Sequence, residues 1–415
     1  MSMSTILLLG GAQFQVDAIL AAKKLGYRTV LCDYLPDNPG QYAADVFYQL
    51  STTDYEAVLG VAKDERIDGV LSFGSDVAAP TAARVAAELG LPGNPIDSVD
   101  ILSKKHLFRA FLESHGFACP QACSFGLDTP LDEVLLQLSH LHLPIMVKPT
   151  DSSGSKGIST IFELSHETVS QAIEFARPFS RNSTLIAEER IASDRPFIVG
   201  GDIFVVDGVV QFWGLMRCLR DYRLTGLVPV GKMFPTGLDA QIETRVRAEL
   251  QRLVTELGFT FGEMNVEVIV GEDGTPYIIE LAARAGGNFI PVQLKDVSGI
   301  DLTAANVLCA MGRKPEELSF SSGGKNIVSC VLHALHAGTL ESVEFSESFA
   351  SAKYRDIRYF EAGDQVPSFV NASDALGVAF FEFADADEMR RLVAHVEEHV
   401  VVKVKGTVSE DAHVH

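Results

Sequence analysis

The chain has 415 residues, a formal net charge of −21 at pH 7 and 47% apolar residues. This length exceeds what one hydrophobic core usually serves, so we expect two or three packed units of roughly 100–200 residues each. The negative charge disfavours binding to nucleic acid or to an anionic membrane surface, because no cluster of basic residues overrides it. No basic segment precedes the apolar run Ile6–Leu9, which ends at Gly10-Gly11, so we expect neither a signal peptide nor a membrane span, and a cytoplasmic location.

The first hundred residues alternate apolar runs with a helical pattern, which predicts a βαβ series and a parallel sheet. Strands are expected at 5–9, 29–33 and 69–73, and a helix at 16–25. The turn Gly10–Gln13 lacks the GxGxxG spacing of a dinucleotide site, so Asp33 is interpreted as an ordinary polar residue at a strand end.

Turn-forming residues mark two boundaries further along the chain. The stretch Gly90–Pro95 is rich in Gly and Pro and predicts a linker, followed by a helix at 99–115. A second boundary is expected near Ser321–Gly324, after which strand-like segments alternate and a last helix lies near 384–399.

The cysteines and histidines show no metal-binding pattern. The six cysteines are scattered without a CxxC pair, which predicts reduced, mostly buried thiols. His333 and His336 have no acidic residue close in sequence and are interpreted as a structural pair.

The segment Pro144–Ile158 is an apolar strand that carries Lys148 and leads into a loop of Ser and Gly at 151–157. Small residues leave backbone N–H groups free to surround phosphate oxygens, and a lysine adds a point charge. The P-loop spacing is absent. From these residues alone, a phosphate-binding loop and a mobile surface loop are both open.

The segment Phe261–Leu281 predicts a hairpin that carries Glu267 and Glu280 among apolar residues. Two opposed carboxylates suit Mg²⁺, although either acid would face solvent if its strand is exposed on one side. Arg284 and Gly286-Gly287-Asn288 follow and suit an anion beside that metal, or else a surface salt bridge.

Two further segments have open interpretations. The turn Gly74-Ser75-Asp76 either faces a substrate or is an ordinary turn from strand to helix. A predicted hairpin and strand at 200–220 carries Trp213, Arg217 and Arg220, which either line a substrate pocket or form a core Trp with solvent-facing arginines.

Taken in order, Lys105, Lys148, the Ser-Gly loop, Glu188-Glu189, Glu267, Glu280 and Arg284 resemble the ATP-grasp superfamily. The resemblance extends to about Val404 and is closest to its carboxylate–amine ligases, such as L-amino-acid ligases, which are related to enzymes of the biotin carboxylase and carbamoyl-phosphate synthase type. It implies an α/β and α+β fold: an N-terminal parallel α/β domain at 1–95, an ATP-grasp domain at 96–320 with a lid at about 117–190, a small C-terminal α+β domain at 321–405 and a flexible tail at 406–415.

The resemblance also implies how ATP is held. Lys105, followed at a Lys-x-x-x-Arg spacing by Arg109, and Lys148 would contact the α- and β-phosphates, with Lys104 as the alternative to Lys105. The backbone of Glu188, Glu189 and Ile191 would read the adenine. The loop over the phosphates would consist of Ser152, Ser153, Gly154, Ser155, Lys156 and Gly157.

By the same resemblance, Glu267 and Glu280 would bind Mg²⁺ or Mn²⁺. Many relatives have a metal-binding Asn two residues after the second glutamate, where this chain has Ala282, so one metal is held more weakly or Asn288 substitutes. Residues implied to be catalytic are Arg284, Lys148 and Asn288, and residues implied to contact substrate are Arg217, Arg284, Gly286 and Gly287.

The implied function is ATP-dependent ligation of a small carboxylate to an amine through an acyl phosphate, with release of ADP and phosphate and an amino acid as one substrate. One alternative is an enzyme that forms carboxyphosphate or formyl phosphate, as in biotin carboxylase or purine biosynthesis. The other is an ATP-binding protein without catalysis. Small carboxylates and amines are the implied partners, and the resemblance alone implies a homodimer.

Overall fold

The computed structural model describes residues 3–191, 197–224, 226–316 and 318–406. The chain divides into two compact units, which are described separately below. Unit 1 contains residues 1–153, 157–215 and 238–321, and unit 2 contains 154–156, 216–237 and 322–415. The division into three domains stays a prediction, and the tail expected at 406–415 lies outside the described residues except for Gly406.

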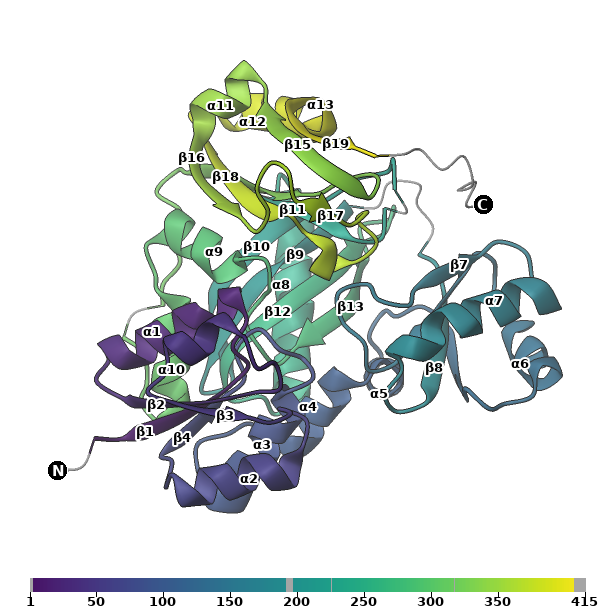
Figure 1. Cartoon of the computed structure of the whole chain (residues 1–415). Coiled ribbons are helices and arrows are strands. Elements are labelled where there is room, and N and C mark those ends of the chain that lie inside the picture. The colour runs from purple at the N-terminus through teal and green to yellow at the C-terminus, as the bar shows by residue number, and fades with distance from the viewer. Residues whose placement is uncertain (1–2, 192–196, 225, 317, 407–415) are drawn as a thin grey trace. The chain divides into compact units, whose positions relative to one another are not determined.

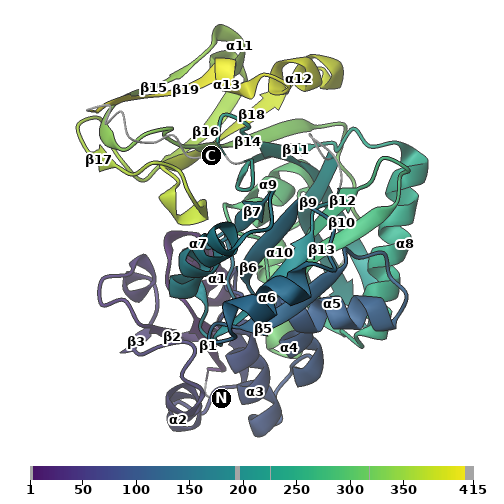
Figure 2. The same ribbon diagram turned by 90° about the vertical axis from the view of Figure 1, so that its right-hand side faces the viewer.

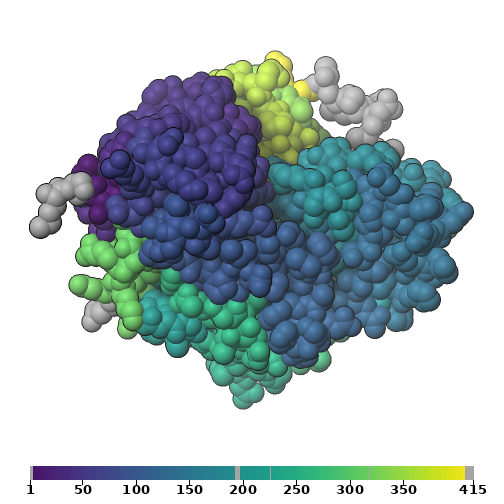
Figure 3. Space-filling view, turned by 90° about the horizontal axis from the view of Figure 1, so that it is seen from below, coloured from purple at the N-terminus to yellow at the C-terminus, as the bar shows by residue number. Residues whose placement is uncertain are grey.

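Unit 1 begins with the parallel sheet that the sequence predicts. Its order is β3-β2-β1-β4. Alternate residues of β1 face opposite sides, so Ile6 and Leu8 pack against α1 and α10, while Leu7 and Leu9 pack against α2 and α3 (Figure 1). The strands are β1 (Thr5–Leu9), β2 (Arg28–Asp33), β3 (Val46–Gln49) and β4 (Gly69–Leu71), and the helices are α1 (Val16–Lys24), α2 (Tyr55–Asp64), α3 (Ala79–Leu89) and α10 (Leu302–Ala310). In the space-filling view the purple N-terminal residues form one continuous body (Figure 3).

Asp33, at the end of β2, is buried, and one of its carboxylate oxygens, Oδ2, accepts a hydrogen bond from the backbone N–H of Gly11 at 2.7 Å. The turn after β1 is therefore closed by this carboxylate, which gives Asp33 a structural role.

The single helix predicted at 99–115 is wrong, because two helices occupy this segment. They are α4 (Ile96–Ser103) and α5 (Lys105–Ser114), and Lys104 between them is extended at φ −128° and ψ 108°. The backbone N–H of Lys105 donates to Thr150 O at 2.8 Å, a residue beyond the helix. This bond starts a new helix at Lys105 and ties it to the end of β6.

The expected lid contains a four-stranded antiparallel sheet of order β5-β8-β6-β7. Helices α6 and α7 cover one of its faces with apolar residues (Figure 2). The elements are β5 (Ala122–Gly126), α6 (Leu131–Leu138), β6 (Ile145–Pro149), β7 (Ser159–Ile161), α7 (His166–Ala176) and β8 (Thr184–Glu189).

The rest of unit 1 is built on a larger antiparallel sheet in which β12 lies between β13 and β9. The predicted hairpin is confirmed, and α5 and α8 pack on one face of this sheet. Its elements are β9 (Phe197–Val206), the first part of β10 (Val209–Arg220), α8 (Ala240–Glu256), β12 (Phe261–Val270), β13 (Pro276–Ala282) and α9 (Ile290–Ser298).

Unit 2 contains the end of β10 and two groups of strands. One group pairs in the order β11-β14-β18-β16 and the other in the order β17-β15-β19. Phe349 of α11 is fully buried against Phe381 and Phe383 of β18. The last helix, predicted at 384–399, is two short helices. The elements are β11 (Pro229–Phe234), β14 (Asn326–Leu332), β15 (Gly338–Phe345), α11 (Glu347–Ala352), β16 (Lys353–Arg358), β17 (Gln365–Val366), β18 (Gly377–Phe383), α12 (Ala386–Val393), α13 (Val396–His399) and β19 (Val400–Lys405).

All six cysteines are free thiols, and Cys32, Cys218, Cys309 and Cys330 are buried, as the sequence predicts. Over the ranges that the structure describes, no helix combines the length and the apolar character that a membrane crossing needs.

Candidate functional site

Three buried charged residues of unit 1 meet in what we call the charge cluster: Arg109 on α5, Lys148 on β6 and Glu188 on β8. The Lys148 Nζ–Glu188 Oε2 distance is 2.7 Å and the Arg109 Nε–Glu188 Oε1 distance is 3.1 Å. Each side chain is at most 6% exposed. Side chains alternate along a strand, so the next residue, Glu189, points away and pairs with His142 instead.

The charge cluster carries more positive than negative charge. Burial raises the pKa of Glu188, but Arg109 and Lys148 outweigh burial and hold this pKa at about 2. The pKa of Lys148 is lowered, because burial and the repulsion from Arg109 and Lys105 outweigh the attraction of Glu188. Among the described residues, Arg109 Nη1 has no hydrogen-bond partner. An anion would therefore complete this cluster.

We expect Glu188→Gln to lower the free energy of unfolding by about 3–5 kcal/mol at pH 7, because two buried cations lose their counter-charge. The pKa of Glu188 is depressed in the fold, so its contribution is present above the ordinary value of 4.5 and is lost as pH falls toward about 2. Urea unfolding at pH 7 and pH 3 measures both effects. The adjacent Glu189→Gln is the control, since its partly exposed pair is worth roughly 0–1 kcal/mol. Equal losses in the two variants would contradict the prediction.

Lys105 connects the Ser-Gly loop with the hairpin. Its Nζ donates to Ser152 O at 2.5 Å and lies 4.0 Å from Glu280 Oε2. Lys104 Nζ instead lies 3.5 Å from Asp100 Oδ2. Lys105, and not Lys104, therefore lies between the Ser-Gly loop and the hairpin.

Two glycines of the loop have backbone conformations that other residues rarely adopt. Gly154 and Gly157 have φ values of 68° and 69°, and a Cβ on Gly157 would lie 2.9 Å from Phe179. Ser152 is buried, and Ser153 hydrogen bonds to Asp76. Residues 154–156, Lys156 included, belong to unit 2, where Gly154 O accepts from Ala372 N at 3.2 Å and Ser155 Oγ donates to Leu227 O at 3.3 Å.

The two hairpin glutamates lie directly opposite each other, since Glu267 of β12 pairs with Glu280 of β13. Both are half-buried, and the pairing is interrupted by a bulge just after Glu267. Two carboxylates on adjacent strands are hard oxygen donors of the kind that Mg²⁺ and Mn²⁺ prefer. No third His, Cys, Asp or Glu joins them within the described ranges. Ala282 is buried, and Asn288 lies in the turn before α9 with φ 50°.

Arg284, just after β13, forms a two-pronged ion pair with Asp76, which lies in the turn between β4 and α3. Arg284 Nε lies 2.7 Å from Asp76 Oδ1 and Nη2 lies 2.8 Å from Oδ2, while Nη1 donates to Ala285 O at 2.9 Å. Burial raises the pKa of Asp76, but Arg284 and Lys105 outweigh it, so the pKa is lowered. Each of the three guanidinium nitrogens of Arg284 thus donates to an acceptor within unit 1.

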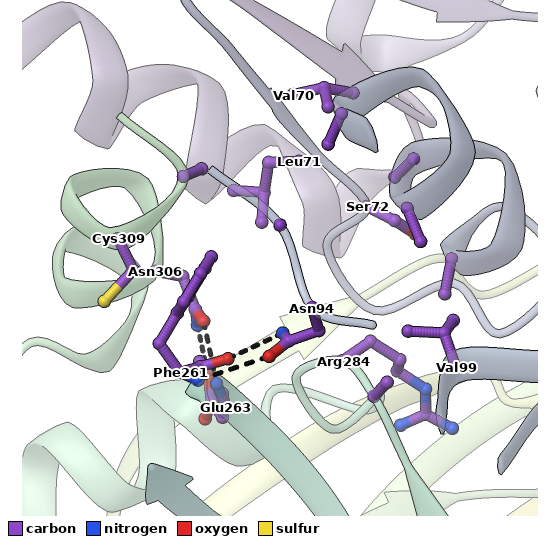
Figure 4. Close-up of a pocket in the computed structure, with 18 of the residues that line it drawn as sticks. Val70, Leu71, Ser72, Asn94, Val99, Phe261, Glu263, Arg284, Asn306 and Cys309 are labelled. Carbon is purple, nitrogen blue, oxygen red and sulfur yellow. Dashed lines mark hydrogen bonds between the residues drawn. The ribbon is translucent and has the colours of Figure 1, made fainter. Parts of the chain in front are cut away.

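A cavity of about 80 Å³ lies beside this ion pair, between β4, α3, β12 and α10 (Figure 4). Most of its lining is apolar, and its polar groups include Asn94, Glu263, Arg284 and Asn306. Asn94 Nδ2 donates to Phe261 O at 2.8 Å, which fixes the start of β12.

The structure also places the remaining predicted residues. Gly286 N donates to Asp202 Oδ2 at 2.9 Å, and Gly287 follows it. Ile191 lies just beyond β8 and is half-buried. The guanidinium of Arg247 lies 5.5 Å from the Trp213 ring in unit 1.

Arg217 and Arg220 of β10, which the sequence offered as candidates to line a substrate pocket, belong to unit 2. There His333 has an acidic partner that is distant in sequence, Asp221, whose Oδ2 lies 3.0 Å from His333 Nε2. The prediction of a histidine pair is thus replaced by a His–Asp pair.

No known family model matches the chain. It is 26% identical to the carbamoyl phosphate synthase large chain of Deinococcus radiodurans over 65% of this chain and 26% of that one. It is 25% identical to carnosine synthase 1 of Mus musculus over 71% of this chain and 38% of that one. The chain therefore spans only about a quarter to two fifths of these two relatives.

Solved structures share the fold over nearly the whole chain. The L-amino acid ligase of Bacillus licheniformis superimposes with a TM-score of 0.78 at 20% identity, covering 97% of this chain and 99% of that one. Solved neighbours with this fold include ADP complexes, one of them with magnesium.

Proposed function

We propose that this chain, a member of the ATP-grasp superfamily, is an ATP-dependent ligase that joins a small carboxylic acid to an amine and releases ADP and phosphate. The observation that carries the proposal is the charge cluster with its excess positive charge, adjoined by a lysine that links the Ser-Gly loop to a pair of opposed carboxylates. Such an arrangement suits a polyphosphate that arrives with a divalent cation.

In this proposal the nucleotide lies over the lid sheet. Lys105 and Lys148 contact the phosphates, and the Ser152–Gly157 loop covers them. The backbone at Glu188–Ile191 reads the adenine. Arg109 Nη1 has no acceptor among the described residues, but it is buried, so we assign Arg109 to the electrostatics of the site.

Glu267 and Glu280 would hold Mg²⁺ or Mn²⁺. The metal supplies charge neutralisation on the phosphate oxygens when it is bound. Ala282 stands where many relatives have a metal-binding Asn. In this proposal the side-chain oxygen of Asn288 takes the place of that ligand.

The reaction proceeds in two steps in this proposal. A carboxylate oxygen of the substrate bonds to the γ-phosphorus, and the bond to the bridging oxygen of ADP breaks, which gives an acyl phosphate. The amine then attacks the carbonyl carbon, loses a proton, and phosphate leaves. Lys148 and Arg284 stabilise the negative charge that moves, and Gly286 and Gly287 present backbone around it. Closure of the loop would exclude water, which otherwise hydrolyses the acyl phosphate.

Trapping with hydroxylamine tests this chemistry. With ATP, Mg²⁺ and a panel of amino acids, hydroxylamine in place of the natural amine is expected to give a hydroxamate of the carboxylate substrate together with ADP. Chromatography of the nucleotides and the colour of the iron–hydroxamate complex measure both products. Formation of AMP would show adenylation and overturn the acyl-phosphate step, whatever the nucleotide site.

An enzyme that activates bicarbonate or formate is the second candidate, because the curated relatives include a carbamoyl phosphate synthase large chain. ADP release that requires bicarbonate or formate, and no amino acid, would favour it. No ADP release with any of these substrates would favour an ATP-binding protein without catalysis. The homodimer and the cytoplasmic location stay predictions.

A further inference from the structure

A second group of polar residues lies buried in unit 1, at the base of the turn that carries Arg284. Asp202 of β9 is fully buried. Its Oδ1 accepts from Asn265 Nδ2 at 2.7 Å and its Oδ2 accepts from Gly286 N at 2.9 Å. Asn265 N donates to Arg284 O at 3.0 Å, so the backbone of the turn is held at both residue 284 and residue 286.

The fit between Asp202 and the turn is close. A Cβ on Gly286 would lie 2.7 Å from Asp202 Oδ1 and 2.9 Å from Asn265 Nδ2. No real side chain fits at such distances, so glycine at 286 is required for the carboxylate to reach the backbone.

Glu263 of β12 lies on the same side of the sheet as Asn265 and is only 1% exposed. Asn306 of α10 holds it from two sides: Asn306 Nδ2 donates to Glu263 Oε2 at 2.5 Å, and Glu263 N donates to Asn306 Oδ1 at 3.0 Å (Figure 4). The other oxygen, Oε1, has no donor among the described residues.

The second carboxyl group lies beside Glu263. β9 and β12 pair with Asp202 opposite Asn265 and Phe204 opposite Glu263, so the two buried acids are diagonal neighbours on one face of the sheet. Two ionised carboxylates repel each other and have no proton to donate, so neighbouring buried carboxyl groups hydrogen bond to each other only if one of them is protonated. Arg284 is a charged group that acts on both acids, and the hydrogen-bond donors around the pair include Asn265, Asn306 and the N–H of Gly286.

We propose that Asp202 and Glu263 share one proton and that this pair positions the Arg284–Gly286 turn for catalysis. One shared proton leaves a single negative charge, which Arg284 and the donors from Asn265 and Gly286 compensate. Both residues are positioning residues, since they act through the turn. Burial, and for Glu263 also the charge of Asp202, raises the pKa of each group, in agreement with a proton held between them.

The first test concerns stability and needs no activity. The pKa of Glu263 is raised in the fold, so its contribution is fully present below the ordinary value of 4.5 and is lost as pH rises through the raised pKa. Glu263→Gln keeps a neutral donor and does not titrate. We therefore expect the urea midpoint of the wild type to fall more between pH 5 and pH 9 than that of Glu263→Gln.

Glu272→Gln is the matched control, since Glu272 is an exposed glutamate in the turn between β12 and β13, and its midpoint should parallel the wild type. Parallel curves for the wild type and Glu263→Gln would overturn the shared proton. So would failure of Glu263→Gln to fold, because a neutral side chain of the same shape is expected to replace the protonated acid.

The second test rests on the proposed function. Glu263→Ala should lower kcat by roughly 10²-fold with little change in the KM for ATP, because the turn moves while the charge cluster does not. Glu263→Gln should restore kcat to within a few-fold of the wild type. A folded alanine variant with normal kcat, or no rescue by glutamine, would overturn the positioning role. A wild type inactive with every substrate would instead refute the proposed function and leave the stability test in force.

Discussion

Glu280→Gln is expected to reduce ADP formation by roughly 10²–10³-fold, because the charge stabilisation that a metal supplies is worth several kcal/mol. Glu280 lies opposite Glu267 and 4.0 Å from Lys105, so the exchange removes one negative oxygen from the pair and leaves the hairpin unchanged. A coupled assay of ADP release over a range of Mg²⁺ concentrations measures the loss, and part of it should be recovered at high Mg²⁺.

The control for this variant is Glu272→Gln, in the same hairpin but exposed. It should retain normal turnover. If Glu280→Gln turned over ATP normally at ordinary Mg²⁺, the hairpin acids would not be the metal ligands.

Arg284→Ala is expected to suppress hydroxamate formation by roughly 10²–10³-fold, the loss usually seen when one donor that stabilises developing charge is removed. The substitution also leaves Asp76 without its main partner, and an unpaired carboxylate would itself repel the substrate. The variant therefore has two reasons to be slow.

The double variant Asp76→Asn/Arg284→Ala separates these reasons, because it removes the repelling charge as well. Hydroxamate formation should stay low in the double variant if Arg284 stabilises the acyl phosphate. Recovery to the wild-type rate would show that Arg284 serves only to neutralise Asp76.

Local patterns predicted much of the fold. Apolar runs that alternate with a helical pattern predicted the N-terminal sheet, with β1 at the residues expected. The Gly-rich turn between two apolar runs predicted the β12–β13 hairpin. The helix break at Lys104 could not be predicted, because it depends on a backbone hydrogen bond to Thr150. Propensity and periodicity hold no information about such a distant acceptor.

The candidate site was predictable in its residues and not in its contacts. Glu188 and Glu189 are adjacent and identical in type. Which of them is buried with Lys148 depends only on which face of β8 each side chain is on. Glu188 meets Arg109 across 79 residues and Arg284 meets Asp76 across 208 residues. The Asp202–Glu263 pair was not anticipated. Its one sequence signal is an acid in an apolar strand, which is costly to bury alone.

The origin of the charge cluster in three separate elements has a consequence for the docking of α5. Lys148 and Glu188 lie on neighbouring strands, β6 and β8, so formation of the lid sheet brings them together as a neutral pair. Arg109 arrives only when α5 docks, and its docking adds a second cation to a site that is already balanced. Docking of α5 therefore takes the Arg109 guanidinium out of water, and both its pair with Glu188 and the apolar contacts of Phe108 and Leu112 must offset that cost.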